Sequence, residues 1–134
     1  MNRSNLLFIV EDTNNNKFGY FFNGTVTNTD GSWMKSSGCF MFSLKSNGRL
    51  NGMKKFEQKD SCAGLDIRSK SSNVLFGIQR GFWIKKENNK QNCECCENGT
   101  YYDYNGLSNV FISNSSTTEY VKFTPKRITV IQMQ

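Results

Sequence analysis

The sequence contains no histidine and only one proline, and these scarcities exclude several kinds of chemistry. Without histidine the chain lacks the usual general base near neutral pH, the Ser–His and Cys–His nucleophile pairs, and the commonest metal ligand. It also lacks a glycine-rich phosphate loop, because neither Gly48 nor Gly52 leads into a Gly-Lys-Ser/Thr ending. The one proline, Pro125, argues against a proline-rich linker. We therefore predict a protein that is not an enzyme and that carries no cofactor.

Long apolar runs are missing as well. No run approaches the ~20 residues that a membrane-spanning helix needs. The first run, Leu6 to Val10, is shorter than the roughly 7–15 residues of a secretory signal, and no small-residue cleavage site follows it. The sequence thus predicts an intracellular protein without membrane insertion, in the cytoplasm, with the nucleus as an alternative. At 134 residues the chain is expected to form a single domain over residues 1–134.

Five cysteines are present, but their spacing fits no standard site. Their odd number argues against a complete set of intramolecular disulfides. Cys93, Cys95 and Cys96 form a Cys-x-Cys-Cys cluster, whereas zinc sites favour matched pairs spaced by two to four residues. We therefore predict no bound metal and keep the cluster only as a weak metal candidate. The flanking Glu94 and Glu97 disfavour a reactive thiolate, so structural thiols are favoured over redox sensing.

What the chain does have is aromatic residues, 13% of the total, arranged in short runs. Each bulky ring buries on the order of 150–250 Å², so these residues can supply a core. The apolar runs predict strands over residues 6–10, 18–22, 39–44, 65–67, 73–78, 82–84, 120–123 and 128–133. Met53 and Phe56, three residues apart, indicate one helical turn at most. The pattern predicts a mainly β protein, an antiparallel β-sandwich with few short helices.

The net charge of +6 is distributed unevenly. Residues 45–90 hold eleven Lys/Arg and four Asp/Glu, a net charge of +7, while the remainder has a net charge of −1. The favoured interpretation is a solvated basic face. The alternative is a surface that attracts phosphates or acidic proteins. The residues proposed for such a binding surface are Lys54, Lys55, Lys59, Arg80, Lys85 and Lys86.

Several short motifs follow one another along the chain. They are Leu7–Asp12, Phe18–Phe21, Trp33, Phe40–Leu44, Phe76–Ile78 with Gly81, Phe82–Ile84, Cys96 with Tyr101, Tyr102 and Asn105–Ser108, and Val121–Phe123 with Ile128–Ile131. Their order resembles the TLDc domain, the C-terminal domain of the oxidation-resistance proteins, over about residues 6–132. The family's N-terminal helical segment has no counterpart here, and Thr129 and Ile131 stand where its last strand carries Glu and Trp.

The resemblance implies a β-sandwich and a set of core and motif residues. These are Phe18, Gly19, Trp33, Phe40, Phe42, Leu44, Gly77 and Trp83. We expect Trp33 to anchor its polar loop in the core, and Phe42 to lie in the core. We also expect Gly19 to mark a bulge or a close backbone approach.

The resemblance further implies a non-catalytic interaction domain linked to oxidative-stress resistance, with the vacuolar proton-pumping ATPase as a protein partner. An alternative from another class is a peroxide-responsive, nucleic-acid-binding regulator that uses the basic region 45–90. Binding driven by phosphates weakens steeply as salt rises, so salt dependence discriminates the two hypotheses.

Overall fold

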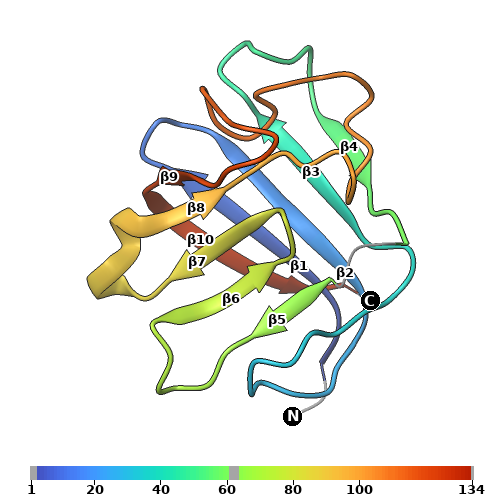
Figure 1. Cartoon of the computed structure of the whole chain (residues 1–134), viewed down its shortest axis with the longest axis vertical. Coiled ribbons are helices and arrows are strands. Elements are labelled where there is room, and N and C mark those ends of the chain that lie inside the picture. The colour runs from blue at the N-terminus through green and yellow to red at the C-terminus, as the bar shows by residue number, and fades with distance from the viewer. Residues whose placement is uncertain (1–2, 61–63, 134) are drawn as a thin grey trace.

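The computed structural model describes residues 3–60 and 64–133, which form two antiparallel five-stranded sheets packed face to face (Figure 1). The first sheet has the strand order β10-β1-β2-β3-β4, and the second has β5-β6-β7-β8-β9. The first sheet contains β1 (Arg3–Asp12), β2 (Lys17–Val26), β3 (Phe40–Lys45), β4 (Lys54–Glu57) and β10 (Pro125–Gln132). The second contains β5 (Leu65–Ile67), β6 (Val74–Ile78), β7 (Phe82–Lys85), β8 (Cys93–Cys95) and β9 (Val121–Phe123). The predicted antiparallel β-sandwich is confirmed.

The core lies between the two sheets, and residue alternation along the strands fills it. On β1 the side chains of Leu6, Phe8 and Val10 are buried, whereas those of Leu7 and Ile9 lie half-exposed on the opposite face. Because successive strand residues point to opposite faces, one apolar set faces the core and the other faces outward. Aromatic rings connect the two sheets, as in the edge-on contact of Phe18 with Phe82, whose centroids are 5.5 Å apart.

The first hairpin, β1 to β2, is held at its turn by a buried carboxylate. The Asp12 side chain accepts hydrogen bonds from the backbone N–H of Asn14 at 3.0 Å and of Asn16 at 2.8 Å. It also accepts one from the Asn16 side-chain amide at 2.8 Å. A short polar side chain at a turn is well suited to this arrangement, which satisfies backbone groups that the hairpin leaves unpaired.

One expectation about local structure is wrong. Met53 and Phe56 do not form a helical turn, because Lys54–Glu57 is strand β4 and Phe56 points into the core. The polar stretch after Lys85 holds two elements that the sequence analysis did not predict. It contains the 3-10 helix η1 (Glu87–Asn92), the only helix among the described residues, and strand β8. Within those residues no helix has the length and apolarity that crossing a bilayer requires.

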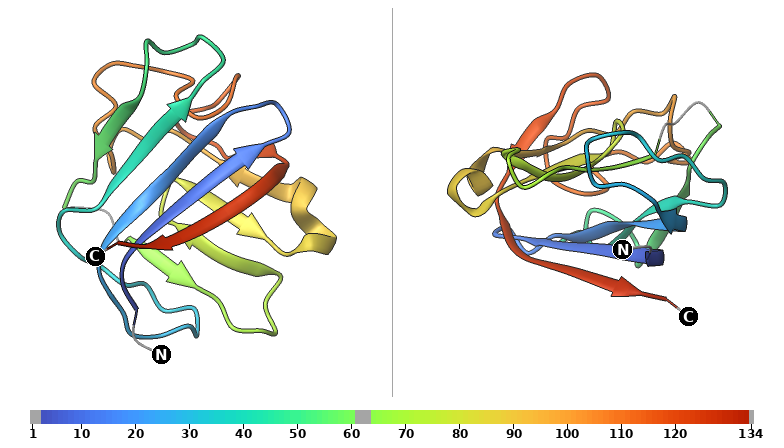
Figure 2. Two further views of the ribbon diagram at one scale, coloured as in Figure 1. Left: turned by 180° about the vertical axis from the view of Figure 1, so that it is seen from behind. Right: turned by 90° about the horizontal axis from the view of Figure 1, so that it is seen from below.

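Within the described residues, contacts and connections at both ends of the chain join the sheets. The loop between β2 and β3 crosses to the second sheet, where Met34 and Leu65 exchange backbone hydrogen bonds at 2.7 and 3.0 Å. At the other end of the chain, only Thr124 separates β9 in the second sheet from β10 in the first. Figure 2 shows β10 running along the margin of the first sheet, beside β1.

Candidate interaction surface

The outward face of the first sheet carries a patch of apolar side chains that no other layer covers in the part of the chain that the structure describes. We call this patch the outer apolar surface; it comprises Leu7, Ile9, Phe40, Phe42, Leu44 and Met53. These residues line a shallow groove of about 330 Å³ together with Lys54 and Lys55. An antiparallel sheet with one solvated face normally places polar side chains on that face. A contiguous apolar patch there is the kind of surface that binds a partner.

Gly19 forms the floor of this surface. It lies directly opposite Phe42 in the β2–β3 register, and the Phe42 ring covers it. A Cβ atom added to Gly19 would come within 2.5 Å of Phe42 Cζ and within 1.9 Å of the Phe8 carbonyl oxygen. The expected close backbone approach is therefore confirmed. The absence of a side chain lets the aromatic ring lie flat against the sheet.

Lysines form the rim at the β4 edge of the outer apolar surface. The Lys55 ammonium lies 4.3 Å from the centroid of the Phe40 ring, and it also pairs with Glu57 at 3.2 Å. Both members of that ion pair are exposed, so the pair adds little stability. The aliphatic part of a lysine can cover apolar surface while its charge stays in water. This rim therefore supplies positive charge beside an apolar floor.

The structure distributes the predicted core and motif residues among three places. Phe18 lies in the core. Gly19, Phe40, Phe42 and Leu44 belong to the first sheet's outward face, and Gly77 and Trp83 to that of the second, where Trp33 joins them. Phe42 is buried as expected, at 7% exposed, but neighbours on the outward face bury it, and it lies outside the apolar cluster between the sheets.

Trp33 is not anchored in the core either. Its side chain is 41% exposed and makes an edge-on contact with Trp83, with ring centroids 5.6 Å apart. The reason is that its loop pairs with β5 at the margin of the second sheet, which places Trp33 above that sheet and outside the sandwich.

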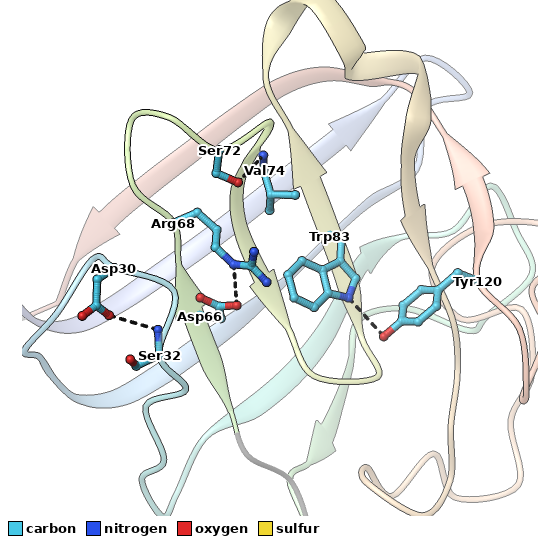
Figure 3. A network of polar contacts seen from close by, with 8 residues as sticks. All are labelled: Asp30, Ser32, Asp66, Arg68, Ser72, Val74, Trp83 and Tyr120. Atoms are coloured by element: carbon cyan, nitrogen blue, oxygen red, sulfur yellow. Dashed lines mark hydrogen bonds and ion pairs between the residues drawn. The ribbon is translucent and has the colours of Figure 1, made fainter.

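Figure 3 shows how polar groups surround Trp83 on the second sheet. The indole N–H donates to the Tyr120 hydroxyl at 3.2 Å, and the Arg68 guanidinium lies 5.4 Å from the ring centroid. Arg68 also pairs with the fully buried Asp66 at 2.7 Å. Gly77 lies beneath the ring, where an added Cβ would be 2.2 Å from it. These contacts hold Trp83 in place, and they leave the face partly polar.

The surroundings of the three clustered cysteines indicate a structural role. Cys93, Cys95 and Cys96 are all buried, on or next to β8. Burial raises the pKa of all three thiols, that of Cys96 to about 11. Their side chains lie among backbone groups: Cys93 accepts from the Lys85 N–H at 3.1 Å, and Cys96 donates to the Arg80 carbonyl at 3.2 Å. Among the described residues, no three His, Cys, Asp or Glu side chains are placed to hold a metal ion.

Glu97, which follows the cluster, holds the loop beyond it. Its carboxylate is almost fully buried and accepts the backbone N–H of Val110 at 2.8 Å. Burial raises the pKa of this carboxyl, and the hydrogen bonds from the loop oppose that shift. A buried carboxylate that receives backbone donors is a common way to fix an irregular segment. Glu97 therefore has a structural explanation and needs no role in chemistry.

The six basic residues proposed as one binding surface do not gather in one place. Lys54 and Lys55 lie on the first sheet, whereas Lys85 ends β7 in the second and Lys86 follows it. The Lys59 ammonium donates to the Gly99 carbonyl at 2.6 Å, and Arg80 occupies the β6–β7 turn. Lys86 donates to a carbonyl in a neighbouring loop, that of Lys70.

Only Lys85, of those six, joins a new basic group. A groove of about 360 Å³ brings it together with Lys90, Lys126 and Arg127, beside the acidic Glu87. Lys126 and Arg127 belong to β10, so residues far apart in the chain make this groove. Its members could not be found from a local concentration of charge.

Sequence reasoning also missed three members of the outer apolar surface, Leu7, Ile9 and Met53. The signal for the first two was available, because they alternate with the buried Leu6 and Phe8 on an unbroken apolar strand. A strand that is apolar on both faces indicates that both faces meet apolar groups. Met53 carries no such signal, since it precedes a strand that the sequence did not predict.

The fold and this surface define a class of protein, the antiparallel β-sandwich domain with an apolar outward face. A comparison with family models is more specific: the model of the TLDc domain matches residues 1–129. The chain therefore belongs to the TLDc domain family, the domain of the oxidation-resistance proteins, and the resemblance seen in its motifs is confirmed. No curated protein matches the chain.

Proposed function

We propose that this chain acts as a non-catalytic protein-interaction domain and that its partner binds the outer apolar surface. The observation that carries the proposal is the contiguous apolar patch on an outward sheet face, bordered by Lys54 and Lys55. Burial of apolar area is the main source of affinity in protein association, and an aromatic floor such as Phe40 and Phe42 is typical of binding hot spots.

The partner that family membership favours is the cytoplasmic part of the vacuolar proton-pumping ATPase. Binding to the pump would connect the domain to oxidative-stress resistance through control of pump assembly. The lysine rim would then face acidic side chains on the pump, because complementary charge speeds association and fixes orientation.

The test is capture of purified pump by the immobilised domain, with two matched leucine variants. Leu44→Ser removes an apolar group from the outer apolar surface, and Leu75→Ser makes the same change at an exposed position on the second sheet. We expect Leu44→Ser to weaken binding by about tenfold or more, since a buried leucine side chain contributes roughly 1.5–3 kcal/mol. Leu75→Ser should bind as the unmodified chain does. Equal binding by both variants would show that the partner uses another surface.

A second candidate function, nucleic-acid binding, is favoured by the groove of Lys85, Lys90, Lys126 and Arg127. Two of the four cations are paired, Lys90 with Glu87 and Arg127 with Glu11, so the group keeps a net charge of +2. This excess attracts phosphate groups, and counterion release would make the affinity depend on salt. The cysteines are buried and their pKa values are raised, so they do not favour peroxide sensing as part of this second function.

The discriminating measurement is the affinity for a labelled duplex between about 50 and about 200 mM salt. If the groove binds nucleic acid, Lys126→Glu should weaken binding and flatten the salt dependence, whereas Lys54→Glu should change neither. An affinity that is independent of salt, or equal in both variants, would remove this candidate.

A further inference from the structure

The first sheet ends at β10, and the free edge of that strand is unusually apolar. No strand among the described residues pairs with its outer side. Val130 is 51% exposed and Ile131 41%, although they belong to opposite faces of the strand. In Figure 2 the C-terminal half of β10 extends along the margin of the molecule, away from the second sheet. Both faces and one edge of this segment are therefore open to solvent.

Proteins usually protect such an edge. Charged side chains, proline and bulges prevent an unpaired strand from pairing with another chain. On β10 these devices are confined to the beginning, where Pro125, Lys126 and Arg127 lie and where a register irregularity occurs at Asp12. The rest of the strand, residues 128–132, has no charge, no proline and no irregularity.

The free hydrogen-bonding groups on this edge can be assigned. Met133 donates its backbone N–H to the Asn5 carbonyl at 2.8 Å. Because backbone groups of successive strand residues point to alternate sides, the odd-numbered residues of β10 bond to β1. The N–H and C=O groups of Ile128, Val130 and Gln132 must then point away from β1, toward the open edge.

We propose that this edge pairs with the same edge of a second copy of the chain. The two β10 strands would run antiparallel about a two-fold axis, with Thr129 opposite Thr129 of the second copy. Ile128 of each copy would then lie opposite Val130 of the other. This goes beyond the proposed function, since it concerns a different surface and assigns it to the chain itself.

The self-pairing is favoured by the match of the two strands. In this register Ile128 exchanges both backbone bonds with Val130 of the second copy, and Lys126 exchanges both with Gln132. Arg127 lies opposite Ile131, so no two like charges face each other. The Thr129 pair is of the close, non-hydrogen-bonded type, in which threonine pairs are favourable. The faces of the two sheets also match, because residues directly opposite each other in the two copies lie on the same side of the combined sheet.

Two neighbouring registers preserve the faces, and both are less favourable. One would place Val130 opposite Val130 and Ile128 opposite Gln132, and the other would place Ile128 opposite Ile128 and Val130 opposite Lys126. In each of them fewer residues of β10 would exchange backbone bonds with β10 of the second copy. The Thr129 register therefore has the longest bonded segment.

The test is sedimentation velocity of the full chain over a range of concentrations, with two variants at one position. Val130→Pro removes an N–H that points to the open edge, and proline is tolerated at such an edge position. Val130→Thr keeps the N–H and the β-branched shape. We expect a species of twice the 15.4 kDa chain mass for the unmodified chain and for Val130→Thr. Val130→Pro should raise the dimer dissociation constant by roughly tenfold or more.

Disulfide crosslinking checks the register without relying on that variant. Under mild oxidation Thr129→Cys should form a covalent dimer in high yield, and Val130→Cys should form much less, with the unmodified chain as the blank. The close pair at Thr129 brings the two Cβ atoms within about 5 Å, near what a disulfide requires. Preferential crosslinking of Val130→Cys would overturn the proposed register.

Amide hydrogen exchange on the unmodified chain tests the pairing even if Val130→Pro fails to fold. The N–H groups of Ile128 and Val130 should exchange more slowly as protein concentration rises, while that of Met133 should not change. A chain that stays monomeric at all concentrations, or that dimerises equally well as Val130→Pro, would overturn the proposal. Protection of this edge only by an added partner would overturn it too.

Discussion

The outward faces of the two sheets share one arrangement, an aromatic ring packed over a glycine, and they differ in the side chains that surround the ring. On the first sheet Gly19 lies under the Phe42 ring of the neighbouring strand, and on the second Gly77 lies under the ring of Trp83. Around Trp83 a hydroxyl and a guanidinium make directed contacts with the ring. Around Phe42 the neighbours are mostly apolar side chains, with Lys55 directly opposite it on β4.

This difference distinguishes a ring that stabilises its own sheet from a ring that a partner can bind. An aromatic ring over a glycine stabilises a sheet wherever it occurs, so neither ring by itself marks a site. A ring held by specific polar partners is already satisfied within its own fold. A ring surrounded by apolar groups leaves area that a partner can remove from water. The comparison therefore favours the first sheet as the partner-binding face.

The largest expected effect comes from the two glycines. Gly19→Ala should destabilise the chain by about 4 kcal/mol or prevent folding, because the new Cβ meets the Phe8 backbone carbonyl, which cannot move aside. Gly77→Ala should cost less, since the three atoms nearest to its Cβ all belong to the Trp83 side chain. Urea unfolding measures both.

A double variant sharpens this prediction. Adding Trp83→Ala, which removes the covering ring, should recover most of the stability that Gly77→Ala loses. Adding Phe42→Ala should recover little of the stability that Gly19→Ala loses, because the backbone contact remains. Equal relief at the two sites would mean that the glycines play the same part in both sheets.

The covering rings themselves should differ in stability. We expect Trp83→Ala to cost about 3 kcal/mol, because it removes contacts with Tyr120, Arg68 and Trp33 as well as burial. Phe42→Ala should cost about 2 kcal/mol, the transfer term alone, because truncation on an outward face leaves no enclosed cavity. A higher cost for Phe42→Ala in urea unfolding would show that its ring is a core element after all.

Arg68 tests whether the polar groups around Trp83 add stability. Arg68→Met should destabilise by about 2 kcal/mol, below the value for a fully buried pair because the arginine is partly exposed. The variant would leave the Asp66 carboxylate buried without its partner. Adding Asp66→Asn to Arg68→Met should recover part of the loss. If Arg68→Met left the thermal unfolding of the chain unchanged, the ion pair of Arg68 with Asp66 would contribute no stability.

The smallest effect concerns pH. The raised thiol pKa of Cys96 means that the folded state holds its proton more tightly than the unfolded chain. Its contribution to stability is therefore complete below about pH 9 and is lost as pH rises toward about 11. We expect the free energy of unfolding to fall by about 1 kcal/mol over that range. Cys96→Ala should fall less steeply, and identical curves would show that the thiol does not contribute.

Most of the strand pattern could be predicted from alternation and turn residues, but not which face of a strand points inward. On β3 the aromatic residues Phe40 and Phe42 suggested the core, whereas Met41 and Ser43 face it. A period of two shows which residues share a face, and only the packing of the other sheet decides which face is covered.

The remaining errors arise from contacts between distant segments. Trp33 lies outside because its loop pairs with Leu65 on the second sheet, a contact that no local pattern reveals. The basic residues of 45–90 scatter because successive strands of that region belong to different sheets. Cys93-Glu94-Cys95 did carry a local signal, the alternation of a half-buried strand, which the polar residues on either side obscured.

The position of β1 between β2 and β10 has a consequence for the order of events during synthesis. The register pairs Leu6 with Gln132, so one side of the first strand stays without its partner until synthesis has reached residue 132. Contacts between such distant residues are slow to form, because a long loop must close first. The apolar β1 would then be exposed on the ribosome, held only by its hairpin with β2. Chaperone binding to nascent chains should therefore concentrate on this first hairpin and end when β10 emerges.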